Sequence, residues 1–355
     1  MTDTPKGRDF LAANCPMPQL DFDAITLGHG GGGLLTNALL DAGVFELFRD
    51  PRLAERHDGA VLDLSGPTAF TTDSFVVSPI FFPGGTIGEL SVNGTVNDLA
   101  MCGARPQYLS LSFILEEGLS MERFWTVLCA VRAAAEAAGV AVVTGDTKVV
   151  ERGKGDQIFI NTSGLGAVHP KASIHSGRVA VGDRVLLSGD IARHGMAIMS
   201  VREGLAFESP IESDTAALHE PVLALLDELG DAVHLLRDAT RGGVATVLNE
   251  IAGQRQVGVD LRERDIPVSE PVAGACEMLG LDPLYVANEG RFVAVVARDA
   301  ADAALAILKR FPVCTEAAMV GEVVPAHPRQ VVLTSGIGGR RVVSMLPGEQ
   351  LPRIC

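Results

Sequence analysis

The chain has 355 residues, a formal net charge of −15 at pH 7, 47% hydrophobic residues and 5% aromatic residues. This surplus of negative charge argues against binding to nucleic acids or to anionic membranes. The length predicts two domains, and residues 1–20 hold no apolar run typical of a signal peptide. No stretch reaches the length of a membrane span, so we expect a soluble, cytoplasmic protein.

The first part of the chain is typical of an α/β domain preceded by a short arm. We expect the arm at 1–24 and the domain at 25–172, because apolar residues alternate as in strands or recur at helical spacing. The expected elements are a glycine run at 28–33, a helix at 34–40, strands at 61–64 and 69–73, a helix at 87–102, a strand at 107–115, a helix at 121–138, and strands at 140–144 and 157–165.

A second α/β domain is expected at 173–344, after a break near 169–177. Within it, the segment Asp238–Gly243 precedes a helix at 244–252. From 345 to 355 the chain loses its periodicity and contains prolines and a glycine, so we expect a flexible tail.

The six cysteines form no Cys-x-x-Cys pair and no Cys/His cluster at zinc spacing. Cys129 and Cys276 lie in apolar helical segments and are expected to be buried thiols, whereas Cys15 in the arm has no evident partner. A disulfide framework is not expected in the cytoplasm. Cys355 is the last residue of the chain, so its thiol is either incidental or a group that the tail carries to a reaction. Its position excludes prenylation.

The glycine run at 28–33 stands before a helix, where backbone N–H groups and the helix dipole favour an anion. The run lacks the Gly-Lys-Ser/Thr of a Walker A loop and the spacing of a dinucleotide-binding fingerprint. From the residues alone it is either a phosphate cradle or a flexible connector.

Four aspartates are expected at strand ends or in turns: Asp73, Asp98, Asp146 and Asp238. Each alone is best explained as a cap or turn residue. Together they are candidate ligands for Mg²⁺, which prefers hard oxygen atoms and phosphate.

Two further charged residues are candidates for proton transfer. Lys148 follows the strand at 140–144, and Glu289 lies between two apolar strands. A carboxylate and a lysine that meet can relay a proton when burial lowers the pKa of the lysine.

Taken in order, the motifs of this chain resemble those of the HypE-type carbamoyl dehydratases of nickel–iron hydrogenase maturation. The resemblance runs from about residue 25 to the end and rests on the segments 71–74, 83–85, 93–100, 113–118, 144–150, 161–164, 237–243, 288–290 and 352–355. It implies the α/β fold of aminoimidazole ribonucleotide synthetase, selenophosphate synthetase and thiamine monophosphate kinase. In that fold an N-terminal ATP-binding domain dimerises through its sheet, and a C-terminal α/β domain and a mobile tail follow.

The resemblance also implies a role for each candidate residue. Cys355 would carry a carbamoyl group on its sulfur, which ATP-dependent dehydration turns into a thiocyanate that supplies cyanide for the hydrogenase iron. Lys148 and Glu289 would handle protons beside the tail. The implied contacts to ATP are Gly30, Gly31, Gly32, Asp73, Asp98, Asp146, Thr147 and Asp238, with the four aspartates as Mg²⁺ ligands.

The partners implied by the resemblance are a second copy of the chain, a HypF-type carbamoyltransferase and a HypC–HypD-type iron scaffold. The tail would dock inward for dehydration and swing outward for loading and cyanide delivery. Two alternatives stay open. In the first, the chain is another ATP-using enzyme of the superfamily, such as selenophosphate synthetase or a small-molecule kinase. In the second, it is a non-catalytic scaffold regulated by ATP.

Overall fold

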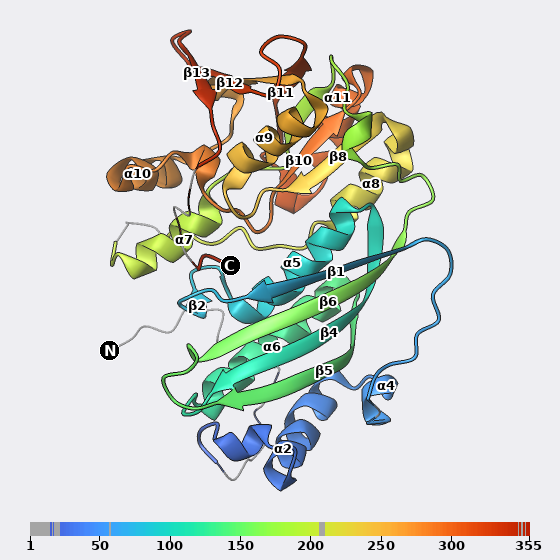
Figure 1. Ribbon diagram of the computed structural model, residues 1–355, viewed down its shortest axis with the longest axis vertical. Helices are drawn as coiled ribbons and strands as arrows, with labels where there is room; N and C mark the ends of the chain where they lie inside the picture. Colours follow the sequence, from blue (N-terminus) through green and yellow to red (C-terminus); the bar gives the residue numbers. More distant parts are fainter. Residues whose placement is uncertain are drawn as a thin grey trace.

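The computed structural model describes residues 15, 17, 22–56, 58–205, 210–346, 348, 351 and 353–355. Most of the arm expected at 1–24 therefore lies outside the described residues. The described chain forms two α/β domains stacked along the long axis, each built on its own sheet (Figure 1). No helix in this part of the chain is long and apolar enough to cross a membrane.

The first domain is a four-stranded mixed sheet in the order β1-β6-β4-β5. Its strands and covering helices are β1 (Thr68–Phe75), α5 (Ile87–Met101), β4 (Ala104–Glu116), α6 (Met121–Ala138), β5 (Ala141–Val150) and β6 (Ile158–Val168). Leu109 and Leu111 of β4 are buried with both helices in one core. Phe70 and Ile114 are 68% and 45% exposed and lie on the opposite face, which these helices leave uncovered. We call this the open face.

Short helical elements lie beside β5, and a small hairpin leads into α5 (Figure 1). They are η1 (Leu27–Gly30), α2 (Leu34–Leu39), η2 (Leu40–Phe45), α3 (Glu46–Phe48), α4 (Pro51–Ala54), β2 (Phe81–Phe82) and β3 (Gly85–Thr86). A capping box starts α5: Gly88 N–H donates to Thr86 Oγ1 at 3.0 Å, and Thr86 N–H donates to Glu89 Oε2 at 2.9 Å.

The second domain is a seven-stranded mixed sheet in the order β13-β12-β9-β11-β7-β10-β8. Its strands are β7 (Arg184–Leu187), β8 (Val233–Asp238), β9 (Gly258–Arg262), β10 (Phe292–Val296), β11 (Ala318–Val324), β12 (Val331–Thr334) and β13 (Arg340–Val343). Its helices are α7 (Arg193–Arg202), α8 (His219–Leu229), α9 (Gly243–Arg255), α10 (Glu270–Leu279) and α11 (Ala301–Leu308), with short turns η3 (Ser176–Arg178), η4 (Gly230–Ala232), η5 (Glu263–Asp265), η6 (Pro283–Tyr285), η7 (Arg298–Ala300) and η8 (Pro312–Cys314).

Both faces of this second sheet are buried. Val185 and Leu187 pack with α9, whereas Leu186 packs with α8 and α11. Met101, the last residue of α5, joins the core under α8. The two domains are therefore packed against each other where α5 ends.

The predicted two-domain α/β fold is confirmed, but three local predictions are wrong. The segment 61–64 is not a strand: Val61 is 93% exposed, and no described strand pairs with it. The strand expected at 140–144 continues to Val150, so Asp146 and Lys148 lie inside β5. Similarly, the strand expected at 69–73 runs on to Phe75, so Asp73 lies inside β1. Asp98 lies inside α5, within the helix predicted at 87–102. Polar residues interrupt the apolar pattern at these sites without ending the element.

The expectation of no disulfide is also wrong, because Cys15 is bonded to Cys129 of α6. Trp125, one helical turn before Cys129, donates its Nε1–H to Cys15 O at 2.8 Å. One residue of the arm is thereby fixed on α6. Cys276 is a buried thiol, as expected.

Candidate active site

Three of the predicted aspartates and Glu289 gather where the two domains meet. Asp73 comes from β1, Asp98 from α5, and Asp238 from the end of β8, and α5 contacts both strands. The charges of the three aspartates all act on Glu289. Thr71 Oγ1 donates to Asp98 Oδ2 at 2.7 Å. We call Asp73, Asp98, Asp238 and Glu289 the carboxylate cluster.

Burial raises the pKa of every carboxyl group in this cluster, and repulsion from neighbouring carboxylates adds to the effect at Asp98, Asp238 and Glu289. Burial, followed by the charge of Asp98, raises the pKa of Asp238 to about 7. Burial, followed by the charge of Asp214, raises the pKa of Glu289 well above its usual range. Burial is also the main cause of the raised pKa of Asp73 and of Asp98. Acids that repel one another in this way favour a bound cation or retained protons.

The loop that carries Glu289 is clamped from both domains. Asn97 Nδ2 donates to Glu289 O at 3.1 Å, and Glu289 N–H donates to Asp214 Oδ1 at 3.1 Å. A Cβ on Gly290 would stand 1.8 Å from Asp214 O, so the backbone approach requires glycine. Glu289 is 3% exposed, and its Oε1 has no hydrogen-bond partner among the described residues. This buried oxygen therefore lacks a hydrogen bond that a bound ligand would supply.

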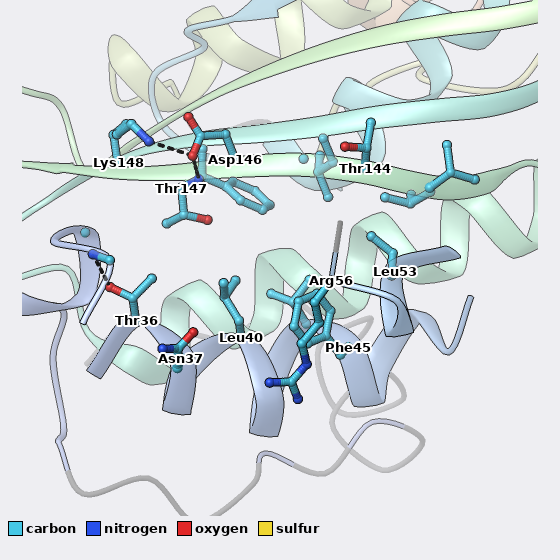
Figure 2. Close-up of a pocket in the computed structure, with 18 of the residues that line it drawn as sticks. Thr36, Asn37, Leu40, Phe45, Leu53, Arg56, Thr144, Asp146, Thr147 and Lys148 are labelled. Atoms are coloured by element: carbon cyan, nitrogen blue, oxygen red, sulfur yellow. Dashed lines mark hydrogen bonds and ion pairs between the residues drawn. The ribbon is translucent and has the colours of Figure 1, made fainter. Parts of the chain in front are cut away.

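A second group of predicted residues lies at the other edge of the first sheet. Asp146, Thr147 and Lys148 are consecutive in β5, and Lys148 Nζ is 2.7 Å from Asp146 Oδ1 (Figure 2). This contact lowers the pKa of Asp146. Both side chains are more than half exposed, so the pair adds little stability.

A cavity of about 340 Å³ opens between β5 and the helical segment α2–η2 (Figure 2). Leu40, Phe45 and Leu53 give it apolar walls, and Thr147 lines it. Gly30 and Gly32 of the glycine run also line it, and a Cβ on Gly30 would stand 2.6 Å from the backbone nitrogen of Val149. The run therefore lies directly against β5. Apolar walls beside a glycine-rich loop suit a nucleotide.

Within one chain the cavity and the carboxylate cluster lie apart. The strand register pairs Asp73 with Thr162, Thr162 with Leu111, and Leu111 with Gly145. Three strand spacings of about 4.8 Å therefore separate Asp73 from Gly145, roughly 14 Å in all. Asp146, the next residue, does not join the other three aspartates in this chain.

Lys148 and Glu289 do not meet in one chain either. Lys148 stands in register with Ile114 on the open face. Glu289 contacts Asn97 of α5, on the helix-covered side of the sheet. The two residues therefore lie on opposite sides of the first sheet.

No three His, Cys, Asp or Glu side chains stand close enough to hold a metal ion in the part of the chain that the structure describes. Mg²⁺ commonly binds through one or two carboxylates together with phosphate oxygens and water. The cluster, with its unpartnered Glu289 oxygen, fits Mg²⁺ that enters with a nucleotide better than a preformed metal centre.

The end of the tail is docked between the domains, beside α7 and β2 (Figure 1). Val76 N–H donates to Cys355 O at 3.1 Å and Ser78 N–H to Arg353 O at 3.4 Å, which is an antiparallel pairing with the chain after β1. Ile354 is 3% exposed, and Arg353 pairs with Asp156 at 2.6 Å. We call 353–355 the tail end.

A second cavity, of about 380 Å³, lies beside the tail end. Ile354 lines it on one side, and Arg241 and Ala287 line it on the other. Arg241 follows Asp238 by three residues, and Ala287 precedes Glu289 by two. The loops that carry Asp238 and Glu289 therefore border the same cavity as Ile354, the residue that precedes Cys355.

Comparisons with known proteins identify the family. The models of the AIR synthase related protein match 56–168 (N-terminal domain) and 180–333 (C-terminal domain). The carbamoyl dehydratase HypE of Bradyrhizobium diazoefficiens is 49% identical over 332 residues, which cover 93% of this chain and 96% of that protein. The chain belongs to the HypE family. A solved structure of HypE in complex with ATP is 48% identical, covers 93% of this chain and 99% of its own, and has a TM-score of 0.89.

A solved HypE–HypF complex contains a further chain of this family. That chain is 44% identical, with a TM-score of 0.77, and the match covers 89% of this chain and all of that one. A thiamine monophosphate kinase of Aquifex aeolicus, at 16% identity and a TM-score of 0.56, shares the fold alone. Membership in the HypE family therefore leaves the alternatives of selenophosphate synthetase and small-molecule kinase with little support.

The sequence did not predict the residues that bond to main-chain atoms around the site. Asp214 holds the Glu289 loop, and His194 and Arg202 of α7 bond to carbonyl oxygens of the tail end. No motif marks such residues, because the atoms that they recognise are the same in every residue.

Proposed function

We propose that this chain is an ATP-dependent carbamoyl dehydratase that converts a carbamoyl group on the sulfur of Cys355 into a thiocyanate. The docked tail end is the observation that carries the proposal. Chain ends are commonly loose unless something ties them down. Here Cys355 is tied next to a cavity bordered by the loops of Asp238 and Glu289. The HypE relatives named carbamoyl dehydratases support the same reaction.

The reaction removes one water from the carbamoyl group. The oxygen and both protons on nitrogen leave, and the carbon–nitrogen bond becomes a triple bond. Because the carbamoyl oxygen is a poor leaving group, transfer of the γ-phosphoryl group of ATP to that oxygen makes phosphate the leaving group. In our proposal the cavity beside β5 holds the adenosine between walls such as Leu40 and Phe45, and Gly30, Gly31 and Gly32 cover the phosphates.

One or two of Asp73, Asp98 and Asp238 would hold Mg²⁺ together with phosphate oxygens. Bound Mg²⁺ would neutralise charge on the transferred phosphoryl group. Glu289 accepts a proton from the carbamoyl nitrogen. Its raised pKa makes the ionised form a stronger base than an ordinary carboxylate, and its Oε1 is unpartnered. Lys148 takes part in moving the second proton. Burial of Ile354 beside the thiol limits the access of water to the intermediates.

We propose that the working unit is a homodimer formed through the open face. This face carries the exposed side chains of Phe70 and Ile114, and exposed apolar surface favours docking. Asp146 and Lys148 project from the same face. In such a dimer they serve the carboxylate cluster of the second copy, which accounts for their distance from it within one chain.

Mixing two inactive variants tests the shared site. Lys148→Ala and Glu289→Gln each remove one half of it. In a 1:1 mixture that exchanges subunits, half of the dimers are mixed, and each mixed dimer has one intact site, so about a quarter of the wild-type activity returns. No recovery in subunits proven to exchange would refute the shared site.

The partners and location follow from the proposed reaction. The solved HypE–HypF complex supports a HypF-type carbamoyltransferase as the source of the carbamoyl group. A thiocyanate must pass its cyanide to iron, which supports a HypC–HypD-type scaffold as the acceptor. The need for ATP supports a cytoplasmic location.

Intact-mass analysis tests the dehydratase directly. The protein is loaded at Cys355 by the carbamoyltransferase or chemically by cyanate, and then receives ATP and Mg²⁺. We expect a carbamoyl group on the C-terminal peptide and then the loss of one water, with Cys355→Ala as the control. ATP hydrolysis that proceeds equally without the carbamoyl group would support a different kinase activity. Binding of ATP without turnover of the loaded protein would support the scaffold alternative.

A further inference from the structure

A main-chain oxygen of each of the three residues of the tail end accepts a hydrogen bond. Cys355 O accepts from the backbone of Val76, and Arg353 O accepts from the backbone of Ser78 and from the Arg202 guanidinium. Ile354 O, the carbonyl next to the reactive residue, lies 2.7 Å from His194 Nε2. The chain is therefore held in one register along its last three residues.

The surroundings of His194 fix the proton on this nitrogen. Ser213 Oγ accepts from Thr215 N–H at 3.1 Å and lies 2.8 Å from His194 Nδ1, so its own proton can point to Nδ1. A carbonyl oxygen only accepts, so Nε2 must carry the proton that Ile354 O receives. This arrangement is the neutral Nε2–H tautomer. Burial lowers the pKa of His194, which agrees with an uncharged ring.

The ring cannot turn to another partner without cost. His194 is completely buried, and the edge of the ring contacts Phe82 of β2 with ring centroids 5.5 Å apart. Ser213 is itself tied to the other domain, because its N–H donates to Pro83 O at 2.8 Å. When the tail end leaves, the Nε2–H loses its carbonyl acceptor, and the loss of this hydrogen bond disfavours the undocked state.

We propose that His194 is a positioning residue that holds the carbonyl of Ile354 and thereby sets Cys355 in place for dehydration, with Ser213 fixing its tautomer. The inference rests on the proposed function for its catalytic consequence. The docking of the tail end by His194 does not depend on the proposed function. Because His194 contacts a main-chain oxygen one residue before the thiol, it acts on the location of the reacting group and not on its chemistry.

The test compares four variants of the full-length protein. His194→Leu removes the donor and keeps an apolar side chain of similar bulk. His194→Gln restores an N–H that can reach the carbonyl. Ser213→Ala removes the hydroxyl group that fixes the tautomer of His194. His169→Leu is the matched control, because it removes another mostly buried imidazole whose partner, Asp227, lies on α8. Urea denaturation of each variant confirms that it is folded.

Alkylation of Cys355 by iodoacetamide, followed on the C-terminal peptide, reports undocking without any turnover. Loss of a buried hydrogen bond corresponds to a shift of about five- to a hundredfold in the docking equilibrium. We expect the alkylation rate to rise by that factor in His194→Leu, less in Ser213→Ala, and little in His194→Gln or His169→Leu.

Dehydration of the cyanate-loaded protein in a single turnover reports positioning. We expect the rate in His194→Leu to fall about ten- to a hundredfold at saturating ATP, with the ATP concentration for half-maximal rate unchanged and with recovery in His194→Gln. Equal alkylation and equal turnover in folded wild type and His194→Leu would overturn the inference. A similar change in His169→Leu would also overturn it, because the effect would then reflect stability. If loaded wild type fails to dehydrate, the proposed function is wrong, while the alkylation result still decides whether His194 holds the tail end.

Discussion

Replacement of Asp238 by asparagine should stabilise the metal-free protein at high pH. Asp238 ends β8 inside the carboxylate cluster, where burial and Asp98 raise its pKa from 3.8 to about 7. Below pH 4 the carboxyl group is protonated in both folded and unfolded chains and contributes no difference. Between pH 4 and 7 the folded protein keeps a proton that the unfolded chain has lost, so stability falls as the pH rises.

The size of the effect follows from this shift. A difference of about three pKa units corresponds to at most ~4 kcal/mol above pH 7, at 1.36 kcal/mol per unit. Asp238→Asn removes the ionisation while keeping the shape of the side chain. In EDTA we expect the variant to exceed wild type in free energy of unfolding by up to ~4 kcal/mol at pH 8 and to match it near pH 4.

Urea denaturation across pH 4 to 8.5, with EDTA and again with Mg²⁺ and ATP, measures this difference. Mg²⁺ and ATP should narrow the gap by stabilising wild type, because a ligand that binds only the folded state adds to its stability. A gap that does not change with pH, or a variant less stable than wild type at pH 8, would refute the reasoning. Either result would mean that the Asp238 carboxylate is well solvated or already paired.

Three further predictions concern residues outside this titration. Lys148→Ala should change stability by less than ~1 kcal/mol, because its ion pair with Asp146 is exposed. Single-turnover dehydration by that variant should fall about a hundredfold, and unchanged turnover would exclude Lys148 from proton transfer. Cys15→Ser should lower the free energy of unfolding by up to ~5 kcal/mol in non-reducing urea titrations, because the disulfide spans 114 residues. Dithiothreitol should abolish that difference, and a gap that persists would mean that the residues are not bonded. Gly290→Ala should cost about 3 kcal/mol or more in urea denaturation and stop dehydration, because the methyl group would stand 1.8 Å from Asp214 O; a wild-type denaturation curve would contradict the close approach.

The sequence predicted the elements that carry their own pattern. α5, α6 and α9 appear where helical spacing placed them, and Asp238, the first residue of the predicted segment Asp238–Gly243, is the last residue of β8. Prediction failed where structure depends on a distant neighbour. The run at 61–64 is apolar enough for a strand, but no described edge accepts it. β5 continues through polar Asp146 because β4 pairs with it along its length.

The same distinction between local pattern and distant neighbour applies to the residues of the candidate site. Asp73, Asp98, Asp238 and Glu289 lie together although they come from four separate motifs, and each motif contains the residue that faces the others. The distance of Asp146 and Lys148 from the carboxylate cluster was not predictable, because a motif does not show which face of a strand its residues occupy. Nor was the Cys15–Cys129 bond, since pairing cannot be deduced from spacing alone.

The charge of the whole chain and the charge of the site together explain why a cation must accompany the nucleotide. The protein carries a net charge of −15, and the proposed site gathers four of its carboxyl groups, each with a raised pKa value. A nucleoside triphosphate alone would be repelled by the net charge of the protein and by the carboxylates of the site. Mg²⁺ reverses this, because a cation beside Asp73, Asp98 and Asp238 lowers their pKa values and attracts phosphate at the same time. Binding of the metal nucleotide should therefore release protons from the cluster. The same step would prepare Glu289 to accept the protons of the carbamoyl group on Cys355, because the ionised base forms only when the substrate that needs it has arrived.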